Sequence, residues 1–170
     1  PTHWQDIALQ GNTHPPMSLR VNLRRSTRDR ALAQLAEAGI DAVARGDTGI
    51  LLARPCPVAR LPGFAAGELS VQDLGAQRAA GLLDVRPGQR VLDACAAPGG
   101  KASHLLELAD IDLLALDHST RRAQRITENF ERLGLNAGIA IADAADLDAW
   151  WDGKPFDRIL ADVPCSASGV

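Results

Sequence analysis

The stretch that decides the fold is Val91-Leu92-Asp93-Ala94-Cys95-Ala96-Ala97-Pro98-Gly99-Gly100-Lys101. Its apolar start, Val91 and Leu92, predicts a buried strand that ends at Asp93. The small residues that follow predict a tight connection into a helix, where the backbone can approach a ligand closely. The stretch therefore predicts a strand, a ligand-binding loop and a helix in succession.

Strands and helices are expected to alternate around this stretch. The apolar runs predict strands at 90–94, 111–116, 137–142 and 156–161, and the periodic segments predict helices at 73–83, 102–108, 119–133 and 146–151. Continuous apolar strands joined by helices are typical of a parallel, doubly wound sheet. We therefore predict an α/β domain over residues 63–170.

The first part of the chain has a different pattern. Short strands are expected at 18–22, 42–44 and 50–53, with a helix that Ser26 or Thr27 caps and Gly39 ends. A proline-rich segment around residues 55–63 is typical of a linker. Residues 1–62 are therefore predicted to form a small α+β subdomain.

Composition excludes several classes of protein. Among the 170 residues, 46% of them hydrophobic, no run approaches the roughly 20 apolar residues of a membrane span, and no signal peptide is recognisable. The three cysteines, Cys56, Cys95 and Cys165, form no C-x-x-C pair, so neither a disulfide framework nor a metal site is expected. We predict a cytoplasmic protein that binds no metal and no membrane.

Charge is unevenly distributed, although the formal net charge is −3. Residues 1–60 hold eight arginines against five acidic residues, whereas residues 61–170 hold ten basic against sixteen acidic residues. A cluster of arginines near the start could bind RNA phosphates, or could simply be a solvated face. The RNA-binding candidates are Arg20, Arg24, Arg25 and Arg28.

An aspartate follows each of the four strands predicted after residue 90. Because the carboxyl ends of parallel strands share one edge, these side chains are expected near a ligand, although any of them could instead cap a helix. Asp117, at the end of the second strand, lies where a carboxylate accepts hydrogen bonds from a ribose diol. An adenosine-bearing cofactor is predicted, with Asp93, Asp117, Asp143 and Asp162 at this edge.

The loop chemistry narrows the type of cofactor. A nicotinamide dehydrogenase would require G-x-G-x-x-G after the first strand, and residues 95–101 do not supply it. Lys101 opens a helix, where a cation opposes the helix dipole. We therefore expect Lys101 to pair with a carboxylate of the protein or the ligand, unless it is only a solvated side chain.

A thiol follows the last predicted strand, in Asp162-Val163-Pro164-Cys165-Ser166-Ala167-Ser168-Gly169. A cysteine at the mouth of a cofactor site suggests covalent chemistry on a pyrimidine, although a lone cysteine is more often a small core residue. Enzymes that methylate amino groups place Asn/Asp-Pro-Pro-aromatic here, which Val163 and Cys165 do not fit.

Together these motifs resemble the Sun-type (Fmu, RsmB-like) 16S ribosomal RNA cytosine-5 methyltransferase family. Residues 91–101 resemble its cofactor loop, residues 162–169 its first cysteine motif, and residues 16–22 and 70–73 the stretches before its catalytic domain. The resemblance implies a Rossmann-like S-adenosylmethionine-dependent methyltransferase fold, with an incomplete doubly wound sheet after a small α+β subdomain. It implies S-adenosylmethionine as cofactor and RNA, 16S rRNA in particular, as partner.

The resemblance also assigns roles to residues. Asp117 would bind the ribose, Asp143 the adenine side, and Asp162 the region of the transferred methyl group and target base. Cys165 would assist release of the product, while the attacking cysteine is expected in a later motif beyond Val170. The residues implied to surround the methionine and adenosine are Cys95, Ala96, Ala97, Pro98, Gly99, Gly100 and Lys101.

Only four of the seven strands of such a sheet are recognisable, and the helical NusB-like domain of the family is not. The chain is therefore expected to bind cofactor and RNA without transferring a methyl group by itself, and to self-associate through the exposed edge of its last strand. The full-length enzyme is expected to be a monomer. A tRNA cytosine-5 methyltransferase and a pure RNA-binding module are the alternatives.

Overall fold

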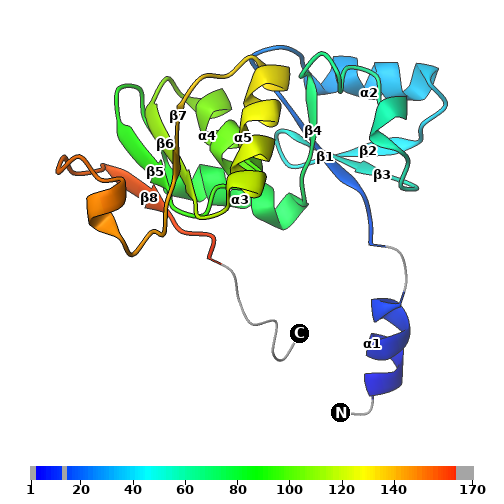
Figure 1. Cartoon of the computed structure of the whole chain (residues 1–170). Helices are drawn as coiled ribbons and strands as arrows, with labels where there is room; N and C mark the ends of the chain where they lie inside the picture. Colours follow the sequence, from blue (N-terminus) through cyan, green and yellow to red (C-terminus); the bar gives the residue numbers. More distant parts are fainter. Residues whose placement is uncertain (1–2, 13–14, 164–170) are drawn as a thin grey trace.

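A computed structural model describes residues 3–12 and 15–163 of the chain. Figure 1 shows two sheets side by side, with an N-terminal helix, α1 (Trp4–Gly11), set apart from both. The predicted fold class, mixed α/β with a parallel sheet, is confirmed. The chain contains two units, each built on one sheet. The first holds β1 (Ser18–Val21), α2 (Arg28–Glu37), β2 (Ala42–Arg45), β3 (Gly49–Leu52), η1 (Val58–Arg60) and β4 (Leu69–Val71).

The first sheet is antiparallel, with the strand order β2-β3-β1-β4. Helix α2 starts at the expected cap, because the Thr27 side chain accepts a hydrogen bond from the backbone of Arg30. Leu19, Leu35 and Ile50 are fully buried between this helix and the sheet. Strand β4 pairs with β1, so the first sheet continues past the boundary predicted at residue 62.

The second unit is built on a parallel sheet with the strand order β7-β6-β5-β8. The predicted strands and three of the predicted helices form, whereas the helix expected at 146–151 is only a short 3-10 turn. The Asp146 side chain makes no capping hydrogen bond there. The elements are α3 (Leu74–Leu83), β5 (Arg90–Asp93), α4 (Gly100–Leu108), β6 (Asp112–Asp117), α5 (Thr120–Leu133), β7 (Gly138–Ile141), η2 (Leu147–Ala149) and β8 (Arg158–Leu160).

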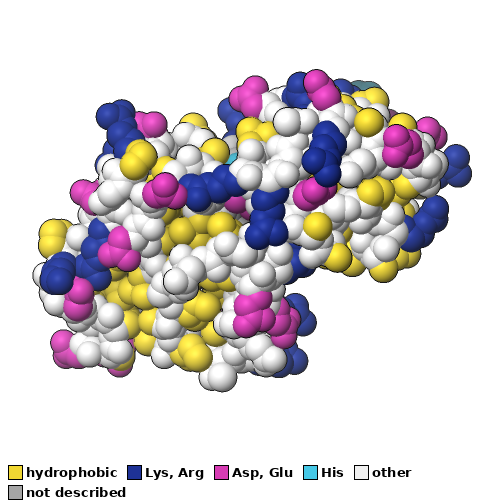
Figure 2. Space-filling model, turned by 90° about the horizontal axis from the view of Figure 1, so that it is seen from above, with side chains coloured by type: hydrophobic (Ala, Val, Ile, Leu, Met, Phe, Trp, Pro, Cys, Tyr) yellow, Lys and Arg dark blue, Asp and Glu magenta, His cyan; other side chains and the backbone are white. Residues whose placement is uncertain are grey.

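The three helices of this unit cover one face of its sheet. Val91, Leu113 and Ala115 pack against them in the core. The alternate residues of the strands lie on the other face, where Leu92 is flanked by Leu114 and Ile159. No helix of the described part of the chain packs there, and Ile159 is 56% exposed. Figure 2 shows hydrophobic side chains gathered in one area of this half of the molecule, with charged side chains around it.

Candidate functional site

The loop between β5 and α4 is held by hydrogen bonds from several directions. The backbone N–H of Ala97 donates to Asp117 Oδ2 (3.2 Å) and Arg122 donates to the carbonyl of Ala97 (3.3 Å). Asn129 donates to the carbonyl of Pro98 (2.8 Å), and the bond between Ala97 and Pro98 is cis. The three side chains that hold the loop all lie outside it, so β6 and α5 fix its shape.

Gly99 is required where the loop turns into helix α4. Its φ of +96° lies in the left-handed region, which residues with a side chain rarely adopt. A Cβ here would also lie 3.4 Å from Ile126 of α5. Glycine at this position therefore lets the loop pack closely against α5 as it turns into α4.

Asp117 ends β6 directly beside this loop. Its side chain is 2% exposed, and besides Ala97 it accepts a hydrogen bond from the backbone of Ser119 (3.0 Å). The guanidinium of Arg122 lies 3.3 Å from Oδ2. These partners aim the carboxylate at the sheet edge, in the position predicted for a group that binds ribose.

Asp93 is the most deeply buried of the four aspartates predicted at this edge. It is 1% exposed, and neither carboxylate oxygen makes a hydrogen bond of ordinary geometry within the described residues. Burial raises its pKa to about 6, against the smaller opposing effects of the Cys95 backbone and the Lys101 charge. A buried carboxylate without a partner is costly unless a cation or donor arrives to bind it. The only sequence signal was its place at the end of the first parallel strand.

A cavity of about 320 Å³ opens at this edge. It brings together three of the predicted cofactor residues, Cys95, Asp117 and Asp143. Asp143 is exposed and accepts a hydrogen bond from the backbone of Ala145 (2.9 Å). An aspartate that only stabilises a turn makes the same hydrogen bond. The cavity lining consists of Ala94, Cys95, Asp117, His118, Arg122, Ala142, Asp143 and Ala144.

Lys101 and Asp162 form an ion pair across the sheet edge. Lys101 therefore has the carboxylate partner expected for a cation in the first turn of a helix, and that partner comes from the segment after β8. Neither residue lines the 320 Å³ cavity. The pair instead borders the buried Asp93 carboxylate, whose pKa both charges affect.

Cys95 lines the cavity but is not activated as a nucleophile. Burial, and then the carboxylates of Asp117 and Asp93, raise the pKa of its thiol. Cys95 therefore stays a neutral thiol at neutral pH. Cys165, the other cysteine predicted to lie at this edge, is outside the described residues, and its role stays a prediction.

The arginines predicted to bind RNA are largely directed at the protein itself. Arg20 is 1% exposed and hydrogen-bonded to Glu107, so the prediction that it contacts RNA is wrong: β1 is buried on both faces. Arg24 donates to the carbonyl of Glu107, Arg25 to that of Ala66, and Arg28 to those of Gly46 and Asp47. The last three retain exposed surface, and their contact with RNA stays a prediction.

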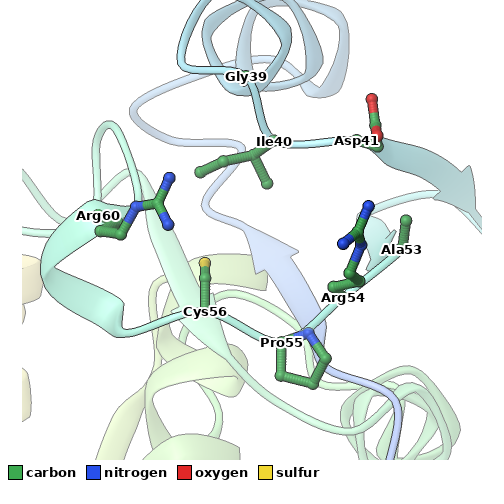
Figure 3. Close-up of a pocket in the computed structure, with 8 residues that line it drawn as sticks. All are labelled: Gly39, Ile40, Asp41, Ala53, Arg54, Pro55, Cys56 and Arg60. Carbon is green, nitrogen blue, oxygen red and sulfur yellow. The ribbon is translucent and has the colours of Figure 1, made fainter.

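A second cavity, of about 330 Å³, lies in the first unit. Figure 3 shows Arg60 and Arg54 on opposite sides of it, with Ile40 and Cys56 between them. Both arginines are exposed, and within the described ranges neither makes a side-chain hydrogen bond or ion pair. The guanidinium groups at this cavity are therefore more available to an anionic partner than those of Arg24, Arg25 and Arg28, which donate to backbone carbonyls.

Two classes of site find no support among residues 3–12 and 15–163. No cluster of three or more His, Cys, Asp or Glu side chains there could hold a metal ion. No helix in the same ranges is long and apolar enough to cross a membrane.

Comparison with known families matches both units. Residues 80–170 match the model of the 16S rRNA methyltransferase RsmB/F family, and residues 1–59 match the ferredoxin-like domain of RsmF/B-like methyltransferases. The chain is 54% identical over its whole length to the ribosomal RNA small subunit methyltransferase B of Pseudomonas syringae, and 51% identical to that of Shewanella oneidensis. It covers 39% and 40% of those relatives, so it spans about two fifths of their length.

Solved structures show the same architecture. A methyltransferase homologue from Pyrococcus horikoshii superposes with a TM-score of 0.80 at 29% identity, over 96% of this chain and 55% of the other. NSun6 from the same organism, solved with SFG, also has a TM-score of 0.80, at 19% identity over 91% of this chain and 64% of the other. The second likeness shows the fold alone.

Proposed function

Because the chain belongs to the 16S rRNA methyltransferase RsmB/F family, we propose that it forms the cofactor-binding part of an enzyme that methylates C5 of a cytosine in 16S rRNA. The enzyme would take its methyl group from S-adenosylmethionine. The relatives named as ribosomal RNA small subunit methyltransferase B support the RNA substrate. Attack at C5 is the chemistry of the family that the sequence motifs resemble.

The observation that carries the cofactor assignment is the pair of buried carboxylates on either side of the glycine loop. S-adenosylmethionine has an ammonium and a sulfonium at one end and a ribose diol in its middle. The Asp93 carboxylate is buried and makes no hydrogen bond of ordinary geometry among the described residues. It suits a cation, because a desolvated charge is stabilised strongly by an opposite one. Asp117 borders the cavity, where it suits the diol. The residues present therefore fit the cofactor.

The remaining loop residues would shape the site. Gly99 provides the left-handed turn into α4, and Ala96, Ala97 and Gly100 are proposed to lie against the methionine and adenosine. Asp143, on the far side of the cavity, is proposed for the adenine side. When bound, S-adenosylmethionine supplies a methyl group on a positively charged sulfur, which a nucleophilic carbon can displace.

The reaction at cytosine would depend on thiols near this edge. C5 becomes nucleophilic after a thiolate adds to C6, and we assign that thiolate to a later motif of the full-length enzyme. Cys165 would assist breakdown of the adduct. Asp162, held by Lys101, would lie beside the methyl group and the target base. We further propose a cytoplasmic, monomeric full-length enzyme.

Calorimetric titration with S-adenosylhomocysteine, the demethylated cofactor, tests this function. We expect binding by the native chain and none by Asp117→Ala, with Asp112→Ala as the matched control. Asp112 is an exposed aspartate at the other end of the same strand. Absence of binding by the native chain, with folding verified by circular dichroism, would refute the cofactor assignment. Tighter binding of tRNA than of 16S rRNA fragments would favour the tRNA alternative.

A further inference from the structure

Arg20 is buried where the first sheet meets the second unit. Its side chain is fully inaccessible, and it forms a two-pronged ion pair with Glu107 of α4: Nε to Oε2 is 2.9 Å and Nη2 to Oε1 is 2.7 Å. Figure 1 shows β4 and its neighbour β1, which carries Arg20, in the half of the first sheet that lies nearer the second unit. This ion pair therefore joins the two units.

The remaining nitrogen of Arg20 reaches the start of the same helix. Nη1 donates to the carbonyl of Gly100 (2.8 Å) and to Oε1 of Gln72 (2.6 Å). Gly100 and Glu107 are seven residues apart, so they lie on one face of α4, and a glutamate side chain points back toward the helix N-terminus. One guanidinium thus fixes both the first turn of α4 and its last.

We propose that Arg20 is a positioning residue for the cofactor, acting from the first sheet through the Gly100 carbonyl. This inference rests on the proposed function. Gly100 directly follows the left-handed Gly99, so the hydrogen bond from Arg20 sets where the glycine loop enters the helix. The loop is then held from behind by Arg20 and from the α5 side by Arg122 and Asn129. The cofactor site would therefore comprise both units.

The chemistry of this position demands arginine. A guanidinium presents its donors in a rigid fork that can engage a carboxylate with two of them and a carbonyl with the third, whereas an ammonium is a single point charge. Arg20→Lys should keep the opposite charge beside Glu107 and lose the simultaneous grip on Gly100. Its effect on cofactor affinity should therefore exceed its effect on folding.

Stability and positioning can be separated by a double variant. Replacing only one member of the buried pair leaves an uncompensated charge, whereas replacing both by apolar residues of similar volume is often neutral or stabilising. The test is calorimetric titration of the native chain, Arg20→Lys and Arg20→Met/Glu107→Met with S-adenosylhomocysteine, beside urea unfolding of each. The control is Arg132→Met, which removes bonds to Phe64, Leu69 and Ser70 but none to the loop.

We expect the double variant to unfold at a urea midpoint close to that of the native chain, yet to bind about tenfold more weakly. Arg20→Lys should also bind about tenfold more weakly, and Arg132→Met should keep native affinity while unfolding more easily. Native affinity in the double variant would overturn the positioning role even if the proposed function holds. If the native chain itself does not bind, the cofactor assignment fails, and this inference fails with it.

Discussion

The buried carboxylate of Asp93 gives the sharpest prediction, because replacing it should stabilise the fold while it weakens cofactor binding. Its pKa is about 6 in the folded chain against an ordinary value of 3.8. That difference corresponds to about 3 kcal/mol between the two protonation states. Because the folded pKa is raised, the folded chain binds more protons between these values, and stability is lost as pH rises toward and through 6.

Asp93→Asn removes this titration and should therefore be more stable than the native chain at neutral pH. The gain should be near zero at about pH 3.5 and grow to at most about 3 kcal/mol above about pH 7. Urea unfolding at a series of pH values measures it, with Asp112→Asn as the control at an exposed aspartate of the neighbouring strand. A native chain whose stability relative to Asp93→Asn is independent of pH would refute the reasoning.

Cofactor binding should change in the opposite direction. If the Asp93 carboxylate pairs with the cationic end of S-adenosylhomocysteine, Asp93→Asn loses a charged hydrogen bond of about 1.5–3 kcal/mol, or roughly 10- to 150-fold in affinity. In the native chain the affinity should fall as pH drops below about 6, the pKa of this carboxyl group. Undiminished affinity in Asp93→Asn would show that Asp93 is a structural residue only.

Three further outcomes are expected. Gly99→Ala forces a side chain into a left-handed backbone at about 1–2 kcal/mol and should weaken S-adenosylhomocysteine binding. Gly81→Ala, with open space at its Cβ inside helix α3, should instead raise the urea midpoint. Arg54→Gln/Arg60→Gln should weaken binding of a single-stranded RNA. The slope of log affinity against log salt concentration should become shallower by about 0.7 for each phosphate that is no longer neutralised. An unchanged slope would exclude the cavity of Figure 3 from RNA binding. Ile159→Lys should shift the chain toward monomer in sedimentation experiments, because it charges the uncovered sheet face; native self-association in this variant would exclude that face.

The local patterns allowed most of the second unit to be predicted. Apolar runs and glycine positions located the parallel strands and the loop to within a few residues, because the central strands β5 and β6 are largely buried and their sequences are therefore continuously apolar. The carboxyl-edge rule then predicted Asp117 at the sheet edge, where it lines the cavity. The same rule could not rank Asp93 above Asp143, since a sequence does not show which aspartate will lack a hydrogen-bond partner.

The errors arose where segments distant in sequence pack together. Arg20 alternates with Leu19 and Val21, which predicts an outward-facing, solvated side chain. In the fold, α4 covers that outward face, so the arginine is buried against Glu107. The proline-rich segment likewise suggested a boundary, yet the chain returns to add β4 to the first sheet. Neither contact leaves a local signal.

These two contacts change what counts as the functional unit. The boundary predicted at residue 62 would assign the first sheet to RNA and the second to the cofactor. Strand β4 leads directly into α3 of the second unit, and Arg20 ties β1 to the first and last turns of α4. Separating the units would take the Arg20 guanidinium away from both Glu107 and the Gly100 carbonyl. The cofactor loop is therefore expected to keep its geometry only when both sheets are present, whatever binds to the first.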